Sequence, residues 1–186
     1  ERSNLSAKFE HITPTILLFL NKLRRLIIKD GFGKEVVTRD MQRRDMENGL
    51  VELCTNDDDV VQFVVVKEKL NVAKEIARNA DQDFTEVALA FASSPDAAAC
   101  MSRDDFPVYA FLPVQPYGFK FIVQADFVVP ASRQAVDHDA PWNQWVRSQL
   151  PNLFMAAIDR AKVKDHPLDL QLVLDAVPLE KDIIGF

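Results

Sequence analysis

Short apolar runs, separated by turn-forming or polar residues, dominate the middle of the sequence and most constrain how the chain can fold. They cover residues 50–55, 60–67, 86–92, 108–114 and 119–128. Each run has the length and composition of a β-strand. From residue 141 the pattern becomes helical and continues to about residue 163, with Pro151 expected either to kink that helix or to start a second one. The sequence therefore predicts an α/β (α+β) fold in which a mixed sheet is backed by helices.

A helix is expected near the N-terminus. Thr13 can cap it and Pro14 can open it, and the apolar residues that follow as far as Ile27 recur at helical spacing. Apolar residues cover most sides of this segment, which is typical of a helix that is either buried deep in one domain or pressed between two domains. Its place near the N-terminus of an apparent fragment favours the second. We therefore expect residues 1–28 to form a joint between a single domain, residues 1–186, and a preceding domain that is missing from the sequence. Residues 31–34 indicate a turn between strands near residues 26–29 and 35–38.

Composition excludes several classes of protein. The net charge of the 186 residues is −6, which disfavours nucleic acid as a partner, because nucleic-acid binding depends on many cationic contacts to phosphates. No apolar run reaches the roughly 18 residues that span a bilayer, so no membrane partner is expected. Two cysteines, Cys54 and Cys100, do not form a disulfide scaffold, which favours a nuclear or cytoplasmic protein. The sequence starts at Glu1 without a methionine, so we expect a fragment.

No complete catalytic motif is present. The five glycines do not form GxxxxGK[ST] or GxGxxG, so the chain has no recognised phosphate cradle, and it also lacks GxSxG. Asp137, His138 and Asp139 could suggest a metal site or a general base, but a polar turn at a helix entry also explains them. The acidic stretch at residues 56–59 lacks the glycine and distal glutamate of an EF-hand loop, and is expected to be a solvated hairpin tip.

The stretch at residues 127–134 is a more specific candidate. An apolar strand leads into Pro130, then into Ser132 at an expected helix N-cap and Arg133 in the expected first turn. Cations are disfavoured at helix N-termini, so this placement suggests that the guanidinium meets an external anion. Planar bidentate donors suit phosphate. A surface arginine beside an acidic neighbour is the other interpretation, and spacing alone leaves both open.

A family resemblance bears on this choice. Residues 107–136, followed by Pro-Trp-Asn-Gln-Trp-Val at residues 141–146, resemble the NO VEIN family. Residues 16–23, 85–91, 177–180 and 184–186 also match the pattern of that family. Its large members carry a histidine-kinase and heat-shock-chaperone-like (GHKL) ATPase domain and are similar to sacsin in that part. The matching region follows the ATPase domain and resembles the middle, or transducer, domain of the ninety-kilodalton heat-shock chaperones, a fold type that also occurs in a ribosomal protein.

The resemblance implies a role for the stretch around Arg133. Those chaperones carry a strand–Leu-Pro–Ser-Arg-Glu–helix element there, whose arginine reaches the ATP γ-phosphate. Residues 129–134 would be the equivalent element, with Ser132, Arg133 and Gln134 as cofactor-binding residues and Arg133 as the catalytic, phosphate-sensing one. Gln134 replaces the glutamate, so any ion pair of that glutamate is lost. ATP with Mg would be bound mainly by a domain absent from this chain.

Two functions from different classes follow. In the first, the chain couples ATP hydrolysis in a larger protein to conformational change, with the N-terminal ATPase domain as its partner. In the second, it is a non-catalytic scaffold module of a sacsin-like protein that binds client or partner proteins through the exposed apolar helix. A free-standing hydrolase that uses Asp137, His138 and Asp139 is a third and remote alternative. Trp142 and Trp145, one helical turn apart, are expected in the core.

Overall fold

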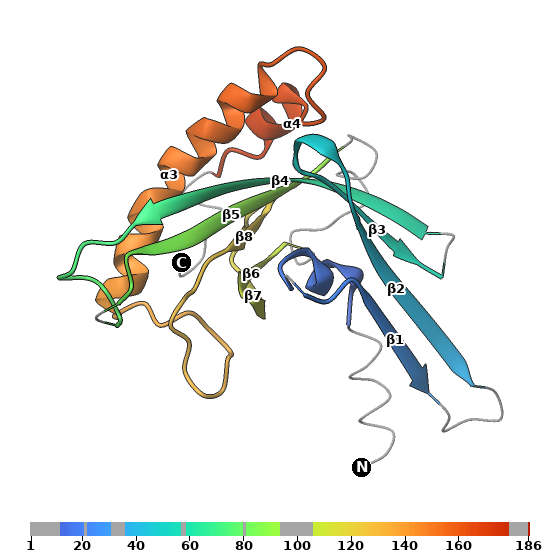
Figure 1. The fold of residues 1–186 in the computed structure, drawn as a ribbon, viewed down its shortest axis with the longest axis horizontal. Helices are drawn as coiled ribbons and strands as arrows, with labels where there is room; N and C mark the ends of the chain where they lie inside the picture. The colour runs from blue at the N-terminus through green and yellow to red at the C-terminus, as the bar shows by residue number, and fades with distance from the viewer. Residues whose placement is uncertain are drawn as a thin grey trace. The chain divides into compact units, whose positions relative to one another are not determined.

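A computed structural model describes residues 12–20, 22–30, 36–56, 59–79, 81–93, 106–178 and 186 (Figure 1). The chain divides into two compact units, an N-terminal unit, Glu1–Gln62, and a C-terminal unit, Phe63–Phe186. It passes from one to the other within strand β4, Asp59–Asn71. Helices and mostly antiparallel strands occur together, which confirms the predicted α/β (α+β) class. None of the helices in the described ranges has both the length and the hydrophobicity needed to cross a membrane.

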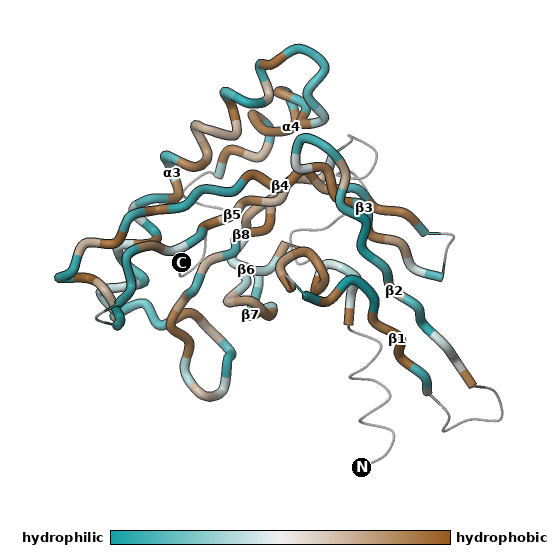
Figure 2. Tube along the Cα trace, in the orientation of Figure 1, coloured by the Kyte–Doolittle hydropathy of each residue, from teal (hydrophilic) through white to brown (hydrophobic). Residues whose placement is uncertain are grey.

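The N-terminal unit is built on antiparallel strands. Strand β2 pairs with β1 on one side and with β3 on the other. The 3-10 helix η1 packs against β2 and β3, and Figure 2 shows hydrophobic residues along it. The elements are η1 (Pro14–Leu18), β1 (Arg25–Asp30), β2 (Val37–Asp45), η2 (Glu47–Gly49) and β3 (Leu50–Thr55).

The expected helix over residues 1–28 is wrong in its extent. Only Pro14–Leu18 is helical within the described part of this range, and Arg25–Asp30 is strand β1, which confirms the strand predicted near residues 26–29. Leu23 and Ile27, which the helical spacing would bury, are 39% and 45% exposed. Pairing of the β1 backbone with β2 therefore overrides a local pattern that is compatible with a helix. The joint to a preceding domain stays a prediction.

The C-terminal unit is a mixed sheet backed by helices. Its strands follow the order β4-β5-β8-β6-β7, and the β6–β8 pair is parallel while β4–β5, β5–β8 and β6–β7 are antiparallel. Helix α3 packs against β5 and α4. After β4, the elements are β5 (Phe84–Ala92), β6 (Pro107–Ala110), β7 (Leu112–Pro116), β8 (Ile122–Gln124), α3 (Pro141–Ala161) and α4 (Leu170–Asp175).

Aromatic packing joins α3 to the sheet. Phe91 on β5 lies 5.2 Å from Phe121 and 5.9 Å from Phe154 on α3, measured between ring centroids, and the Phe121–Phe154 distance is 5.4 Å. Tilted and edge-on pairs at these distances add to the burial of apolar surface. Helix α3 continues past Pro151, so a second helix starting there is wrong. Pro151 faces solvent, where water can satisfy the carbonyl that its missing N–H leaves free.

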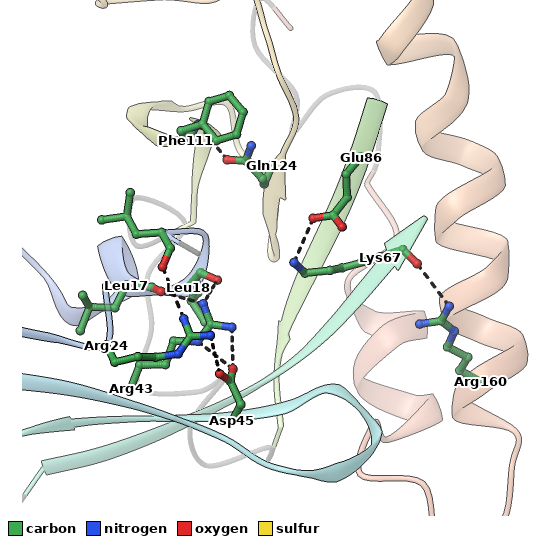
Figure 3. Close-up of polar contacts among 11 residues, drawn as sticks. Leu17, Leu18, Arg24, Arg43, Asp45, Lys67, Glu86, Phe111, Gln124 and Arg160 are labelled. Atoms are coloured by element: carbon green, nitrogen blue, oxygen red, sulfur yellow. Dashed lines mark hydrogen bonds and ion pairs between the residues drawn. The ribbon is translucent and has the colours of Figure 1, made fainter. Parts of the chain in front are cut away.

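The run at residues 108–114, expected as one strand, is instead a hairpin. Strands β6 and β7 pair antiparallel and reverse at Phe111, whose φ is +63°. A bulky side chain is disfavoured in that left-handed region. The side-chain oxygen of the buried Gln124 accepts the Phe111 N–H at 2.9 Å and holds the reversal (Figure 3). Because the sequence has no glycine or asparagine here, the turn carries no local signal.

The link between α3 and α4 contains a histidine that is held neutral. Burial lowers the pKa of His166, and the positive charge of Arg160 lowers it further. The neutral Nδ1 accepts the N–H of Leu168 at 3.1 Å. Protonation would replace that acceptor with a donor, so the folded state resists it.

Stability is therefore expected to fall as the pH drops through the His166 range. Between the lowered pKa and the ordinary value of about 6.5, the unfolded chain binds more protons than the folded chain, so unfolding is favoured as pH falls. Urea unfolding of the wild type and of His166→Asn at pH 7.5 and pH 5.0 measures this. The asparagine oxygen can accept the same N–H without titrating, so the variant should lose less stability on acidification. If the wild type and the variant lose the same free energy of unfolding, His166 does not contribute to the pH dependence of stability.

Candidate functional site

The stretch that carries the sequence-predicted site residues is a closed loop, residues 128–137, here called the corner loop. The N–H of Asp137 donates to the carbonyl of Val128 at 3.1 Å and closes it. A tight turn lies inside the loop, since the N–H of Arg133 donates to the carbonyl of Pro130 at 2.9 Å. Ser132 and Gln134 are exposed and Arg133 is half-buried. The loop therefore keeps Ser132, Arg133 and Gln134 together at the surface of the C-terminal unit.

The helix expected to follow Ser132 is wrong. Helix α3 starts at Pro141, with Ala140 as its N-cap, so Ser132 caps no helix. The φ of Arg133 is +53°, a left-handed value that a right-handed helix does not accept. Arg133 therefore does not stand in a helix N-terminus, and the electrostatic argument that its placement is unfavourable does not apply.

The guanidinium of Arg133 contacts the β6–β7 hairpin. Its Nη2 donates to the carbonyl oxygen of Ala110 at 2.9 Å. Ala110 directly precedes Phe111, so this hydrogen bond joins two of the positions in the C-terminal unit where the backbone has a positive φ. Strained backbone of this kind persists only where its surroundings fix it. Among the described residues no carboxylate pairs with Arg133, so the interpretation as an arginine with an acidic neighbour is not supported there.

Asn143 fixes the corner loop to α3, and sequence reasoning did not identify it. Its side chain is fully buried and makes three hydrogen bonds. Nδ2 donates to the carbonyls of Val128, at 2.8 Å, and Asp137, at 2.7 Å, and Oδ1 accepts the N–H of Val128 at 2.8 Å. Both ends of the loop are thus tied to one amide. The sequence signal that could have identified Asn143 is an asparagine on the same side of the predicted helix as the apolar residues expected in the core.

Two aromatic side chains add further anchors. The hydroxyl of the buried Tyr117 accepts the N–H of Val136 at 2.7 Å. The Nε1 of Trp142 donates to the carbonyl of Asp126, just before the loop, at 2.7 Å. Trp142 is buried, which confirms the prediction that it packs in the core, whereas Trp145 is half-buried, with its ring centroid 5.3 Å from that of Trp142.

Asp137, His138 and Asp139 form the turn that enters α3, as one of the two interpretations predicted. The N–H of Asp139 donates to a carboxylate oxygen of Asp137 at 3.1 Å, and the carbonyl of His138 accepts from Gln144 at 3.2 Å. The His138 ring lies edge-on to Tyr117 at 6.2 Å between centroids. In the ranges that the structure describes, no three histidine, cysteine or acidic side chains gather as a metal site would require.

The corner loop offers donors suited to an anion. They are the guanidinium of Arg133, the hydroxyl of Ser132 and the amide of Gln134, all at least partly accessible. The N-terminus of a helix, which would add a row of backbone N–H groups, is absent from the loop. These side chains are therefore hydrogen-bond donors of the kind that an anion accepts from.

Comparisons with known proteins place these features in context. No family model matches the chain, and no solved structure matches it. The sequence is 31% identical over 160 residues to a curated plant protein. That relative is "Protein NO VEIN" of Arabidopsis thaliana. The alignment covers 84% of this chain but only 6% of NO VEIN, so the chain spans a small part of the length of its relative.

Proposed function

We propose that the chain is a transducer-like segment of a larger, chaperone-like ATPase of the NO VEIN type. In this proposal Arg133 contacts the γ-phosphate of ATP, and a GHKL ATPase domain elsewhere in the protein holds the ATP and its Mg. The observation that carries it is a half-buried guanidinium on an anchored loop, with one donor used on Ala110 and no acidic partner among the described residues. The similarity to NO VEIN supports only the part of the proposal that calls the chain NO VEIN-like.

In this proposal, phosphate binding by Arg133 depends on how its backbone is held. Arginine can give a phosphate two parallel hydrogen bonds, which requires that its backbone be held in place. The hydrogen bonds of Asn143 and Tyr117 hold the corner loop in that way. Arg133 also donates a hydrogen bond to Ala110. Movement of the guanidinium toward a phosphate would therefore break or shift this bond and alter the β6–β7 hairpin. A contact made only in the triphosphate state would then bias the protein toward the conformation that allows it.

We also propose binding partners and a cellular location for the chain. The ATPase domain of the same protein is the first partner, and client proteins are the second. Ser132 and Gln134 are proposed to support the phosphate contact from the exposed side of the loop. A nuclear or cytoplasmic location goes with this role.

ATP turnover of the full-length protein tests the proposal. Arg133→Ala should lower turnover by about tenfold to a hundredfold, less than the ~10³–10⁵ that an arginine supplied to a phosphoryl-transfer site can give. Arg160→Ala is the matched control, since its Nη2 also donates to a backbone carbonyl, that of Lys67, at 3.4 Å (Figure 3). ATP turnover should be unchanged in Arg160→Ala. Equal turnover in wild type and Arg133→Ala would contradict the phosphate contact.

An interaction module without ATP coupling is the second candidate. The surface first expected to serve it, an exposed apolar helix near the N-terminus, is wrong, because Leu17, Leu18 and Phe19 of that segment are buried. A different observation favours it, namely a large apolar groove in the C-terminal unit beside α3. Unchanged turnover in Arg133→Ala would leave this function as the better one.

A further inference from the structure

The peptide group that links Ala110 to Phe111, at the tip of the β6–β7 hairpin, is held from both sides. Its N–H, that of Phe111, donates to Oε1 of Gln124 at 2.9 Å (Figure 3). Its carbonyl, that of Ala110, accepts a hydrogen bond from Nη2 of Arg133 at 2.9 Å. Because a peptide group is planar, these two hydrogen bonds together fix the orientation of one rigid unit. The candidate phosphate-contacting arginine therefore helps to set the conformation of the hairpin tip.

The orientation that these bonds hold is a strained one. Phe111 has a φ of +63°, in the left-handed region that bulky side chains disfavour. The side chains of Phe111 and Leu112 are 49% and 40% exposed, so burial of the tip offsets little of this strain. Half a turn of the Ala110–Phe111 peptide would bring φ of Phe111 into the broad, unstrained β region, because rotation of the peptide plane changes that angle directly. The same half turn would break both hydrogen bonds of the peptide.

The two hydrogen bonds differ in how firmly their side chains are held. Gln124 is 6% exposed and lies on strand β8, which pairs with β5 and β6. Arg133 is half-buried on the corner loop and reaches Ala110 through a long side chain with several rotatable bonds. A bidentate bond from arginine to a phosphate is stronger than a single bond to a neutral carbonyl. An anion would therefore draw Arg133 away from the peptide, while Gln124 would stay in place.

We propose that the Ala110–Phe111 peptide is a two-state switch controlled by Arg133. While Nη2 of Arg133 bonds the carbonyl of Ala110, the peptide stays in its strained orientation. When the guanidinium moves to a phosphate, the peptide turns over, Phe111 relaxes to an extended φ, and the exposed tip of the β6–β7 hairpin changes conformation. The phosphate as the trigger rests on the proposed function, whereas control of the peptide by Arg133 does not.

Hydrogen exchange of the residue 111 amide, measured by NMR on the chain itself, tests this control without ATP. The N–H is protected while Gln124 accepts it, and it loses that partner when the peptide turns over. Arg133→Met keeps most of the aliphatic stem and removes the donor to Ala110. The protection factor of the residue 111 amide should therefore fall by about tenfold, with the amides of β5 as the internal reference. An unchanged protection factor in Arg133→Met would overturn the switch.

Substitution of Phe111 in the Arg133→Met background tests whether backbone strain drives the change. Glycine adopts a positive φ without strain, so Phe111→Gly should restore most of the lost protection. Phe111→Ala is the matched control, because alanine also lacks the ring but keeps the steric penalty, and it should leave protection low. Equal protection with glycine and alanine would also overturn the switch. These measurements are independent of ATP turnover in the full-length protein, so the switch and the phosphate contact can fail separately.

Discussion

Replacing Asn143 with alanine is expected to lower the free energy of unfolding of the C-terminal unit by about 3 kcal/mol. The side chain makes three hydrogen bonds from a fully buried position, and each contributes roughly 1 kcal/mol net. Removal also leaves the polar backbone groups of Val128 and the carbonyl of Asp137 without this partner, in a place where water has little access. Urea unfolding followed by the fluorescence of Trp142 and Trp145 measures the loss.

Two further variants sharpen this prediction. Asn143→Asp has almost the same shape, but a carboxylate cannot donate to the carbonyls of Val128 and Asp137 and would bring a negative charge toward them. It should therefore cost at least as much as Asn143→Ala. Asn152→Ala is the matched control, because Asn152 is exposed on the same helix and alanine is the better helix former. If Asn143→Ala and Asn152→Ala unfold at the same urea concentration, the buried amide does not hold the corner loop.

Much of the sheet could be predicted because its strands are apolar runs with turn residues between them. Strand β3 has the predicted bounds, Leu50–Thr55, and β5 starts two residues before the predicted one and ends with it, at Ala92. The β6–β7 hairpin could not be predicted, because its turn depends on a hydrogen bond from Phe111 to Gln124 and not on local turn residues. The predicted N-terminal helix is too long because Arg25–Asp30 pairs with β2, in agreement with the strand that the turn at residues 31–34 predicts near residues 26–29.

The sequence identifies the polar residues of the candidate site but not the contacts that position them. Its polar residues, Ser132, Arg133 and Gln134, can be read from a short stretch, and the structure keeps them together at the surface. What positions them acts over long separations in sequence. Arg133 reaches a carbonyl 23 residues away, and Asn143 reaches one 15 residues away. Contacts of that kind follow from how the elements pack, so no local spacing rule would have identified Asn143 as the anchor.

The second large effect is expected in the N-terminal unit, at Arg43. Its side chain is 8% exposed, and Nη1 donates to the carbonyls of Leu17 and Leu18 at the end of η1, while Nε donates to Asp45 at 2.8 Å (Figure 3). One guanidinium thus satisfies the free carbonyls of a short helix and ties that helix to β2. Arg43→Met keeps most of the aliphatic stem and removes the donors, so two partly buried carbonyls lose their partner at a cost of about 3 kcal/mol.

Hydrogen exchange is the suitable measurement for Arg43, because both tryptophans lie in the C-terminal unit. A loss of about 3 kcal/mol should raise the exchange rate of the β2 amides by roughly a hundredfold, while amides of β5 serve as the internal reference. Arg44→Met is the matched control, since Arg44 is the exposed neighbour on the opposite face of the same strand and its removal should change exchange little. Equal protection of β2 in Arg43→Met and Arg44→Met would mean that η1 is held by the burial of Leu17 and Leu18 alone.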